Sequence, residues 1–168
     1  MPAPATVTTP TDTDVVIVRS FDAPRALVWR AHSEPALMKK WLRGPPGWTL
    51  SACEIDARVG GKFRNVFTQP GQPGFEVRGV FREVKAPERW VHTEEYAAAG
   101  APETTGGGGE EPAVETMVQT ERAVKTTLTM TMHFPSKAAR DAAGAGMAAG
   151  MEETYRRLDD LVASQALA

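Results

Sequence analysis

Residues 124–134 alternate between apolar and polar side chains, and this pattern constrains the fold more than any other feature of the sequence. If this segment is an extended strand, one face carries Val124, Leu128, Met130, Met132 and Phe134. The other face carries Lys125, Thr127, Thr129, Thr131 and His133. A period of two is typical of an antiparallel strand with one face on the core and one in water. Another element of the chain must therefore cover the apolar face.

The segment that follows this strand predicts a long helix suited to that role. Between Ser136 and about Ser164, apolar residues recur every three or four positions at Met147, Met151, Tyr155, Leu158 and Val162. This spacing places them on one continuous stripe of a helix. Glycines at 144, 146 and 150 each cost about 1 kcal/mol relative to alanine in a helix interior. We therefore expect a bend near residues 144–146.

The rest of the chain predicts an α+β domain whose strands pair with the strand at 124–134. Strands are predicted at 15–21, 48–57, 62–68, 75–85, 90–96 and 114–121, and two short helices at 24–32 and 34–42. Residues 1–13 are rich in Pro, Thr and Ala and predict a disordered arm, so residues 14–168 form one domain. Residues 97–112 predict a long loop because they contain no core-forming side chains.

Charge and residue usage exclude several classes of function. The net charge of −2 gives no general attraction for nucleic acid or an anionic membrane. No stretch approaches the roughly 18 apolar residues that span a bilayer. The single cysteine, Cys53, cannot form an internal disulfide, which fits a cytoplasmic protein. The few Cys and His residues are scattered, so we expect no metal site and no cofactor.

An ordered set of short motifs gives a specific resemblance over about residues 14–165. The motifs are RSFDAPRALVWRA at 19–31, EP at 34–35, Trp41, GP at 44–45, EIDARVGG at 54–61, GVF at 79–81, Val84 with PER at 87–89, FPSK at 134–137, and GM at 146–147 and 150–151. The sequence resembles the bacterial homologues of the C-terminal domain of the activator of the heat-shock-protein-90 ATPase. That family belongs to the START-like, or SRPBCC, superfamily.

This resemblance implies the helix-grip fold. In that fold a curved antiparallel sheet of about seven strands surrounds a long C-terminal helix, and two short helices follow the first strand. The superfamily holds small hydrophobic molecules between the sheet and the helix. The family has no catalytic motif in common, so the resemblance assigns no catalytic residue to this chain. We expect the protein to bind a small hydrophobic ligand and lean against an enzymatic role.

Ten residues are candidates for the wall of such a cavity, because they are large or polar-tipped and stand where the sheet, the end helices and the long helix would meet. They are Trp41, Trp48, Phe67, Phe81, His92, Met130, Met132, Met147, Met151 and Tyr155. The alternative for the methionines is ordinary core packing. The alternative for Trp41 and Trp48 is that they pack the end helices against the sheet.

The strand at 90–96 leaves a second function open. Its two faces are almost equally polar, so the pattern does not decide whether His92 and Glu94 point inward. If they do, they form a polar pair in an apolar cleft, which suits acid–base chemistry of a cyclase or hydrolase type. A third alternative is a co-chaperone-like module that binds protein through the outer sheet surface. The edges of an open sheet also make a homodimer conceivable.

Overall fold

The computed structural model of the chain describes residues 2–102, 111–144 and 147–166, with side chains in the last stretch from 150 to 165. The elements in chain order are β1 (Thr6–Thr8), β2 (Asp14–Phe21), α1 (Arg25–Ser33), α2 (Pro35–Trp41), β3 (Thr49–Ile55), β4 (Lys62–Thr68), β5 (Phe75–Lys85), β6 (Arg89–Ala98), β7 (Ala113–Arg122), β8 (Lys125–His133), α3 (Lys137–Gly144) and α4 (Met147–Ala166). The predicted α+β class and the predicted order of elements are confirmed.

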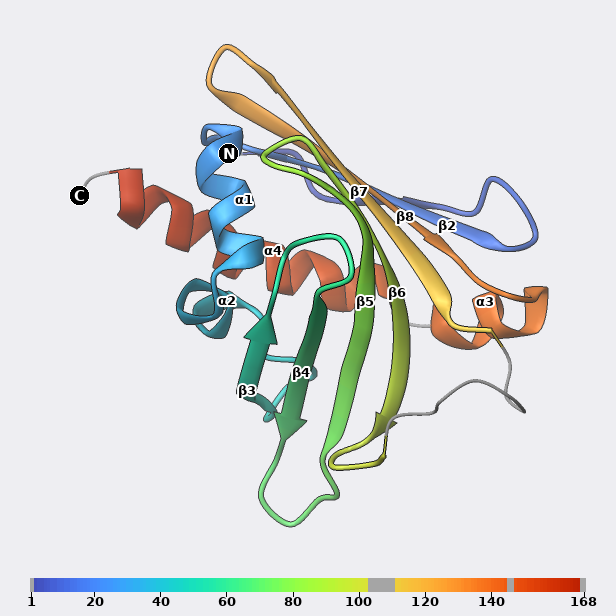
Figure 1. Ribbon diagram of the computed structural model, residues 1–168. Helices are drawn as coiled ribbons and strands as arrows, with labels where there is room; N and C mark the ends of the chain where they lie inside the picture. Colours follow the sequence, from blue (N-terminus) through green and yellow to red (C-terminus); the bar gives the residue numbers. More distant parts are fainter. Residues whose placement is uncertain (1, 103–110, 145–146, 167–168) are drawn as a thin grey trace.

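The strands form one antiparallel sheet in the order β1-β2-β8-β7-β6-β5-β4-β3. The sheet bends around α4, while α1 and α2 close one end (Figure 1). It has eight strands, one more than the sequence predicts. The additional strand, β1, lies in the segment expected to be a disordered arm. Here Thr6, Val7 and Thr8 pair with β2, and Val7 packs against the core from the sheet edge.

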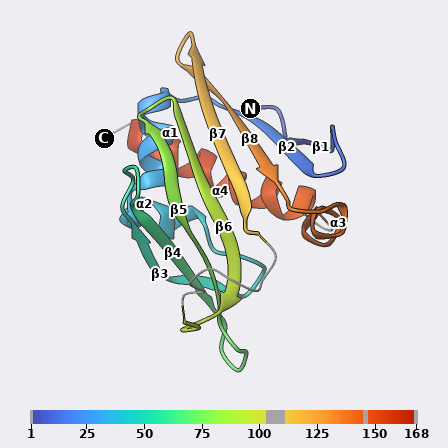
Figure 2. The same cartoon turned by 45° about the vertical axis from the view of Figure 1, so that its right-hand side comes forward.

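The paired strands β5 and β6 approach each other unusually closely at Gly79. A Cβ atom at Gly79 would lie 1.7 Å from the carbonyl oxygen of Thr93, so only glycine fits there. The pairing register of the same two strands shifts between Phe81 and Glu83. Irregularities of this kind bend a sheet and increase its twist. In Figure 2 the long, bent strands β5 and β6 cross in front of α4.

The predicted faces of β8 and of the closing helix are confirmed. Leu128, Met132 and Phe134 are buried, whereas Val124 is exposed because it lies in the β7–β8 turn. On α4, three of the predicted stripe residues are almost fully buried, namely Tyr155, Leu158 and Val162. Within the predicted helix, α3 ends at Gly144 and α4 begins at Met147, and residues 145–146 lie outside the described residues. These positions include part of the segment where a bend is expected.

A buried ion pair joins α4 to β2 of the sheet. Arg19 of β2 is 2 % exposed. Its guanidinium donates to both carboxylate oxygens of Asp159, at 3.1 and 2.7 Å. The same group lies 3.5 Å from Glu152, and its charge stands over the rings of Phe21 and Tyr155. Two parallel hydrogen bonds between a guanidinium and a carboxylate fix the relative orientation of the two groups as well as stabilising the contact. This ion pair therefore positions the helix over the sheet.

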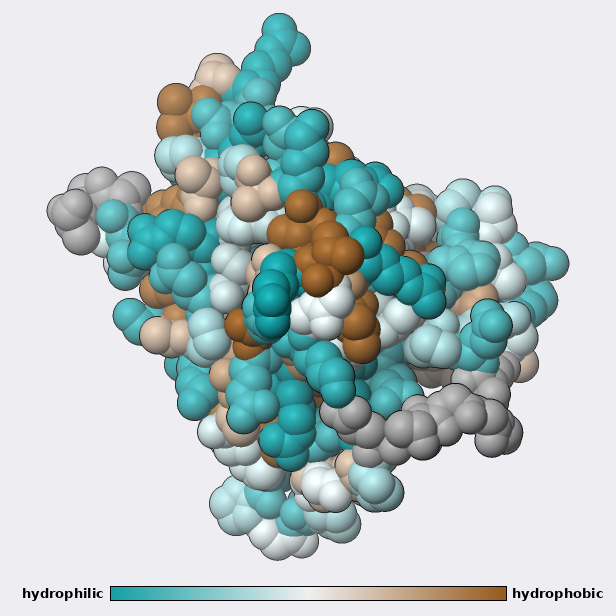
Figure 3. Space-filling view, in the orientation of Figure 1, coloured by the Kyte–Doolittle hydropathy of each residue, from teal (hydrophilic) through white to brown (hydrophobic). Residues whose placement is uncertain are grey.

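The face of the molecule in Figure 3 is mainly hydrophilic, with a small apolar patch near its centre. Val59 and Val80, on the loop after β3 and on β5, are 69 % and 38 % exposed. A few exposed apolar side chains are normal on a protein surface. None of the helices that the structure describes is long and apolar enough to cross a membrane.

Candidate functional site

A cavity of about 760 Å³ lies between the concave face of the sheet and α4. This volume is within the range of small-molecule sites, about 300–1,000 Å³. Its rim includes the exposed residues Pro45, Pro46, Tyr96, Gly150 and Glu153. Its inner lining consists of buried and mainly apolar side chains from β2, β4, β5, β6 and β8 and from the helices. The sheet and helix therefore leave an accessible, mostly apolar space between them.

Aromatic rings form two groups in the wall of this cavity. On the sheet, the imidazole of His92 contacts Phe63, Phe81 and Trp90, with ring centroids 4.5, 5.4 and 5.9 Å apart. On the helical side, Trp41 lies between His32 and Tyr155, with centroids 4.9 and 6.5 Å apart. Aromatic pairs at such separations contribute about 0.5–1.5 kcal/mol each beyond their area burial, so they stabilise this arrangement of the wall.

His92 points into the cavity and is 4 % exposed, which decides the face that the sequence left open. Its Nδ1 lies 2.9 Å from the carbonyl oxygen of Thr93, and its Nε2 lies 3.3 Å from a carboxylate oxygen of Glu115. Both neighbours accept hydrogen bonds, so both ring nitrogens carry protons. Burial disfavours the charged ring, but the carboxylate of Glu115 outweighs it and raises the pKa of His92 to about 9.

Two carboxyl groups next to His92 differ in charge. Glu115 of β7 is the register partner of His92 and also accepts a hydrogen bond from Trp90 Nε1 at 3.2 Å. Burial opposes its ionisation, but the charge and hydrogen bond of His92 hold the pKa of Glu115 below its usual value. For Glu94, burial and the nearby charge of Glu115 raise the pKa to about 8. At neutral pH the site therefore holds an imidazolium–carboxylate pair and one neutral carboxylic acid.

Three further polar groups in the lining have no hydrogen-bond partner among the described residues. They are Nε2 of His32, Oδ1 of Asn65 and the hydroxyl of Tyr155, and each residue is less than a tenth exposed. His32 Nδ1 lies 2.7 Å from the carbonyl oxygen of Val28, so the proton is on Nδ1 and Nε2 is a bare acceptor. Burial lowers the pKa of His32 and keeps the ring neutral.

Most of the sequence-predicted wall residues come together in this cavity. Its lining includes Trp41, Phe67, Phe81, His92, Met130, Met132, Met151 and Tyr155. The backbone of Met147 begins α4, but its side chain lies outside the described residues. Trp48 lines a separate hollow of about 320 Å³.

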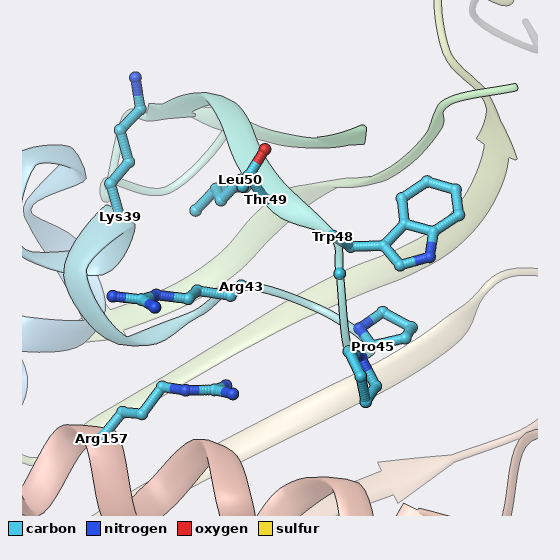
Figure 4. Close-up of a pocket in the computed structure, with 9 residues that line it drawn as sticks. Lys39, Arg43, Pro45, Trp48, Thr49, Leu50 and Arg157 are labelled. Atoms are coloured by element: carbon cyan, nitrogen blue, oxygen red, sulfur yellow. The ribbon is translucent and has the colours of Figure 1, made fainter. Parts of the chain in front are cut away.

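Figure 4 shows this second hollow, with Lys39 and Arg43 on one side and the ring of Trp48 pointing to the other. Trp48 packs on Phe75, with ring centroids 5.1 Å apart. It follows Gly47, whose positive φ of 86° turns the chain before β3 begins. The hollow shares Pro45, Pro46 and Arg157 with the cavity lining, so it adjoins the cavity mouth.

Several polar lining residues were not among the sequence-based candidates. Glu115 pairs with His92 only because β6 and β7 are neighbours in a particular register, which the local pattern does not reveal. His32 is on the buried face of α1, and its position one turn after the apolar Val28 is the signal that could have identified it. Asn65 interrupts the apolar face of β4 between Phe63 and Phe67, which is the signal that could have identified it.

The site does not resemble a metal centre. Among the residues that the structure describes, no three His, Cys, Asp or Glu side chains lie together in a way that could hold a metal ion. Cys53, the only cysteine, is half-buried, and burial raises the pKa of its thiol to about 11. A thiol of this kind is a poor nucleophile at neutral pH.

Comparison with known proteins places the chain in one family. The model of the family described as activator of Hsp90 ATPase homolog 1-like protein matches residues 22–163. No curated protein matches the sequence.

Solved structures agree with this match. A protein from Rhodobacter sphaeroides is 29 % identical, with a TM-score of 0.84 over 96 % of this chain and 99 % of its own. A protein from Nitrosomonas europaea is 25 % identical, with a TM-score of 0.77 over 94 % and 99 % of the two chains. A third, from Mycobacterium smegmatis, is 21 % identical with a TM-score of 0.77 over 95 % and 97 %, and shows the shared fold alone.

Proposed function

This chain belongs to the activator of Hsp90 ATPase homolog 1-like family, within the SRPBCC group, whose members commonly bind hydrophobic ligands, and we propose that it binds a small, largely apolar molecule beneath α4. The observation that carries the proposal is the cavity of about 760 Å³ with its buried aromatic and methionine lining. Burying an apolar molecule there removes its surface from water, which stabilises the complex by about 25 cal/mol per Å² before the costs of association. In this function the protein acts as a binder or carrier.

A fluorescence titration with N-phenyl-1-naphthylamine tests this function. The probe is uncharged and apolar, and its emission increases when it leaves water. We expect saturable binding to the wild type and a clear loss of affinity in Met130→Trp, which enlarges a side chain in the cavity wall. Thr129→Trp places the same side chain one residue earlier, on the opposite face of β8, and should bind the probe as the wild type does. If the two variants bind equally, or if the wild type does not bind, the proposal is wrong.

The polar end of the cavity favours one second function, an acid–base enzyme of the cyclase or hydrolase type. The observation behind it is the charged His92–Glu115 pair beside the neutral acid of Glu94. Native mass spectrometry of freshly purified protein gives the mass of any bound molecule. Incubation of that molecule with the protein then distinguishes the two functions. An enzyme consumes it, and His92→Ala retains the fold but loses this turnover, whereas a binding protein returns it unchanged.

A further inference from the structure

The inner end of the cavity holds a group of polar atoms that the binding of an apolar molecule does not explain. His32, His92, Glu94 and Tyr155 lie within electrostatic reach of the Glu115 carboxylate, and Nε2 of His92 is 3.3 Å from it. All of them line the cavity, and they come from α1, β6 and α4. Buried polar groups in proteins are nearly always hydrogen-bonded, so each group without a partner requires an explanation.

We infer that this inner end is a subsite for a hydroxyl group, and that the ligand is an uncharged alcohol or phenol whose O–H enters first. The inference rests on the proposed binding function and specifies the class of ligand. Nε2 of His32 is an acceptor without a donor, and the hydroxyl of Tyr155 has no partner among the described residues; both rings pack on Trp41. Oδ1 of Asn65 is a further acceptor without a donor, in the β4 wall of the same cavity. A hydroxyl donates one hydrogen bond and accepts others, so it satisfies both kinds of group.

The charges in the subsite favour a neutral ligand group. The imidazolium of His92 is already compensated by the carboxylate of Glu115, 3.3 Å away. Burial raises the pKa of Tyr155 above its usual range, which keeps its phenol protonated and able to donate. A ligand carboxylate would bring an uncompensated charge into this space, at a high desolvation cost. A ketone or ether could accept from Tyr155 but would leave Nε2 of His32 without a donor.

Selectivity follows from what an entering ligand displaces. Water can satisfy these polar atoms while the cavity is open to solvent. A ligand that displaces water without replacing its hydrogen bonds loses affinity, because buried polar groups then remain unsatisfied. Two such bonds restored by one hydroxyl correspond to a preference of about tenfold or more over the matching hydrocarbon.

Displacement of N-phenyl-1-naphthylamine by three related probes tests this inference. The probes are biphenyl, 4-methoxybiphenyl and 4-hydroxybiphenyl, which share one apolar body and differ in the ability to accept or donate. We expect 4-hydroxybiphenyl to bind about tenfold more tightly than the other two. Equal displacement by all three would overturn the hydroxyl subsite and leave the binding function intact. If the fluorescent probe itself does not bind, the proposed function fails, and this inference fails with it.

Variants then locate the subsite. Tyr155→Phe removes only the hydroxyl, and Asn65→Leu removes the amide from a different element, so the test does not depend on the folding of one variant. In each, we expect the ratio of the two affinities, hydroxybiphenyl to biphenyl, to fall at least threefold. Gln119→Leu is the control, because Gln119 is also buried without a partner but does not line the cavity. A preference that both subsite variants retain in full would contradict the assignment.

Discussion

Replacing Arg19 with methionine should lower the stability of the protein substantially. The arginine side chain is 1 % exposed, while its partners Asp159 and Glu152 are 23 % and 21 % exposed. Removing one member of a fully buried ion pair costs about 3–5 kcal/mol, mainly because the other charge stays buried. The two carboxylates here keep some contact with water, so we expect about 2–3 kcal/mol. For a domain of this size, this corresponds to a decrease of about 5–10 °C in the unfolding midpoint.

The assay is thermal unfolding followed by circular dichroism, with Arg30→Met as a matched control. Arg30 pairs with Glu34 at 2.7 Å, but both side chains are about half exposed. Exposed pairs of this spacing contribute about 0.5 kcal/mol or less, so this midpoint should change by less than about 2 °C. A double-mutant cycle of Arg19→Met with Asp159→Asn should give a coupling of at least about 1 kcal/mol. A midpoint of Arg19→Met within 2 °C of the wild type would refute the role given to this ion pair.

Three further perturbations follow from the structure. Gly79→Ala should destabilise the fold by about 1–3 kcal/mol in urea titration, because its Cβ would lie 1.7 Å from Thr93 O; an unchanged midpoint would contradict the close approach. Gly150→Ala should stabilise by about 0.5–1 kcal/mol in the same assay, because it is helical with open space around it, and a loss of stability would be the contrary result. The folded protein binds protons at His92 and Glu94 more tightly than the unfolded chain does, because the usual pKa values of these side chains are 6.5 and 4.5. The stability from these groups is therefore present at low pH. The contribution of Glu94 is lost as the pH rises through about 8, and that of His92 as it rises through about 9. The thermal midpoint should fall between pH 7 and pH 10, less steeply in Glu94→Gln, and equal slopes would contradict the raised pKa of Glu94.

The sequence predicts the strands and the helix that enclose the cavity well, because these elements are specified by local periodicity. The alternation of β8 and the stripe on α4 each specify which face is buried, since a shift of one residue would place the apolar set in water. Motifs such as the one at 19–31 add the order of the elements. These patterns led to Met130, Met132 and Tyr155, which line the cavity.

The sequence does not predict the polar end of the cavity, because that end depends on register and on turns. The faces of β6 are too similar in polarity to show which one is buried. The contact between His92 and Glu115 joins residues 23 positions apart, through the pairing of two strands. The direction of Trp48 depends on the positive φ of Gly47, and no period describes that turn. The local sequence pattern therefore does not predict the position of a side chain that depends on non-local strand pairing or on a single turn.

The central claim is that α4 covers a space that receives a small molecule, and the methyl groups of the methionines report on this space directly. The measurement is an NMR experiment on protein with ¹³C-labelled methionine methyl groups, saturated with N-phenyl-1-naphthylamine. Met130, Met132 and Met151 line the cavity, whereas Met117 is fully buried and does not. The account predicts intermolecular nuclear Overhauser effects from the probe to the first three methyl groups and none to Met117. Bound probe with no such contact to any of the three would contradict the account.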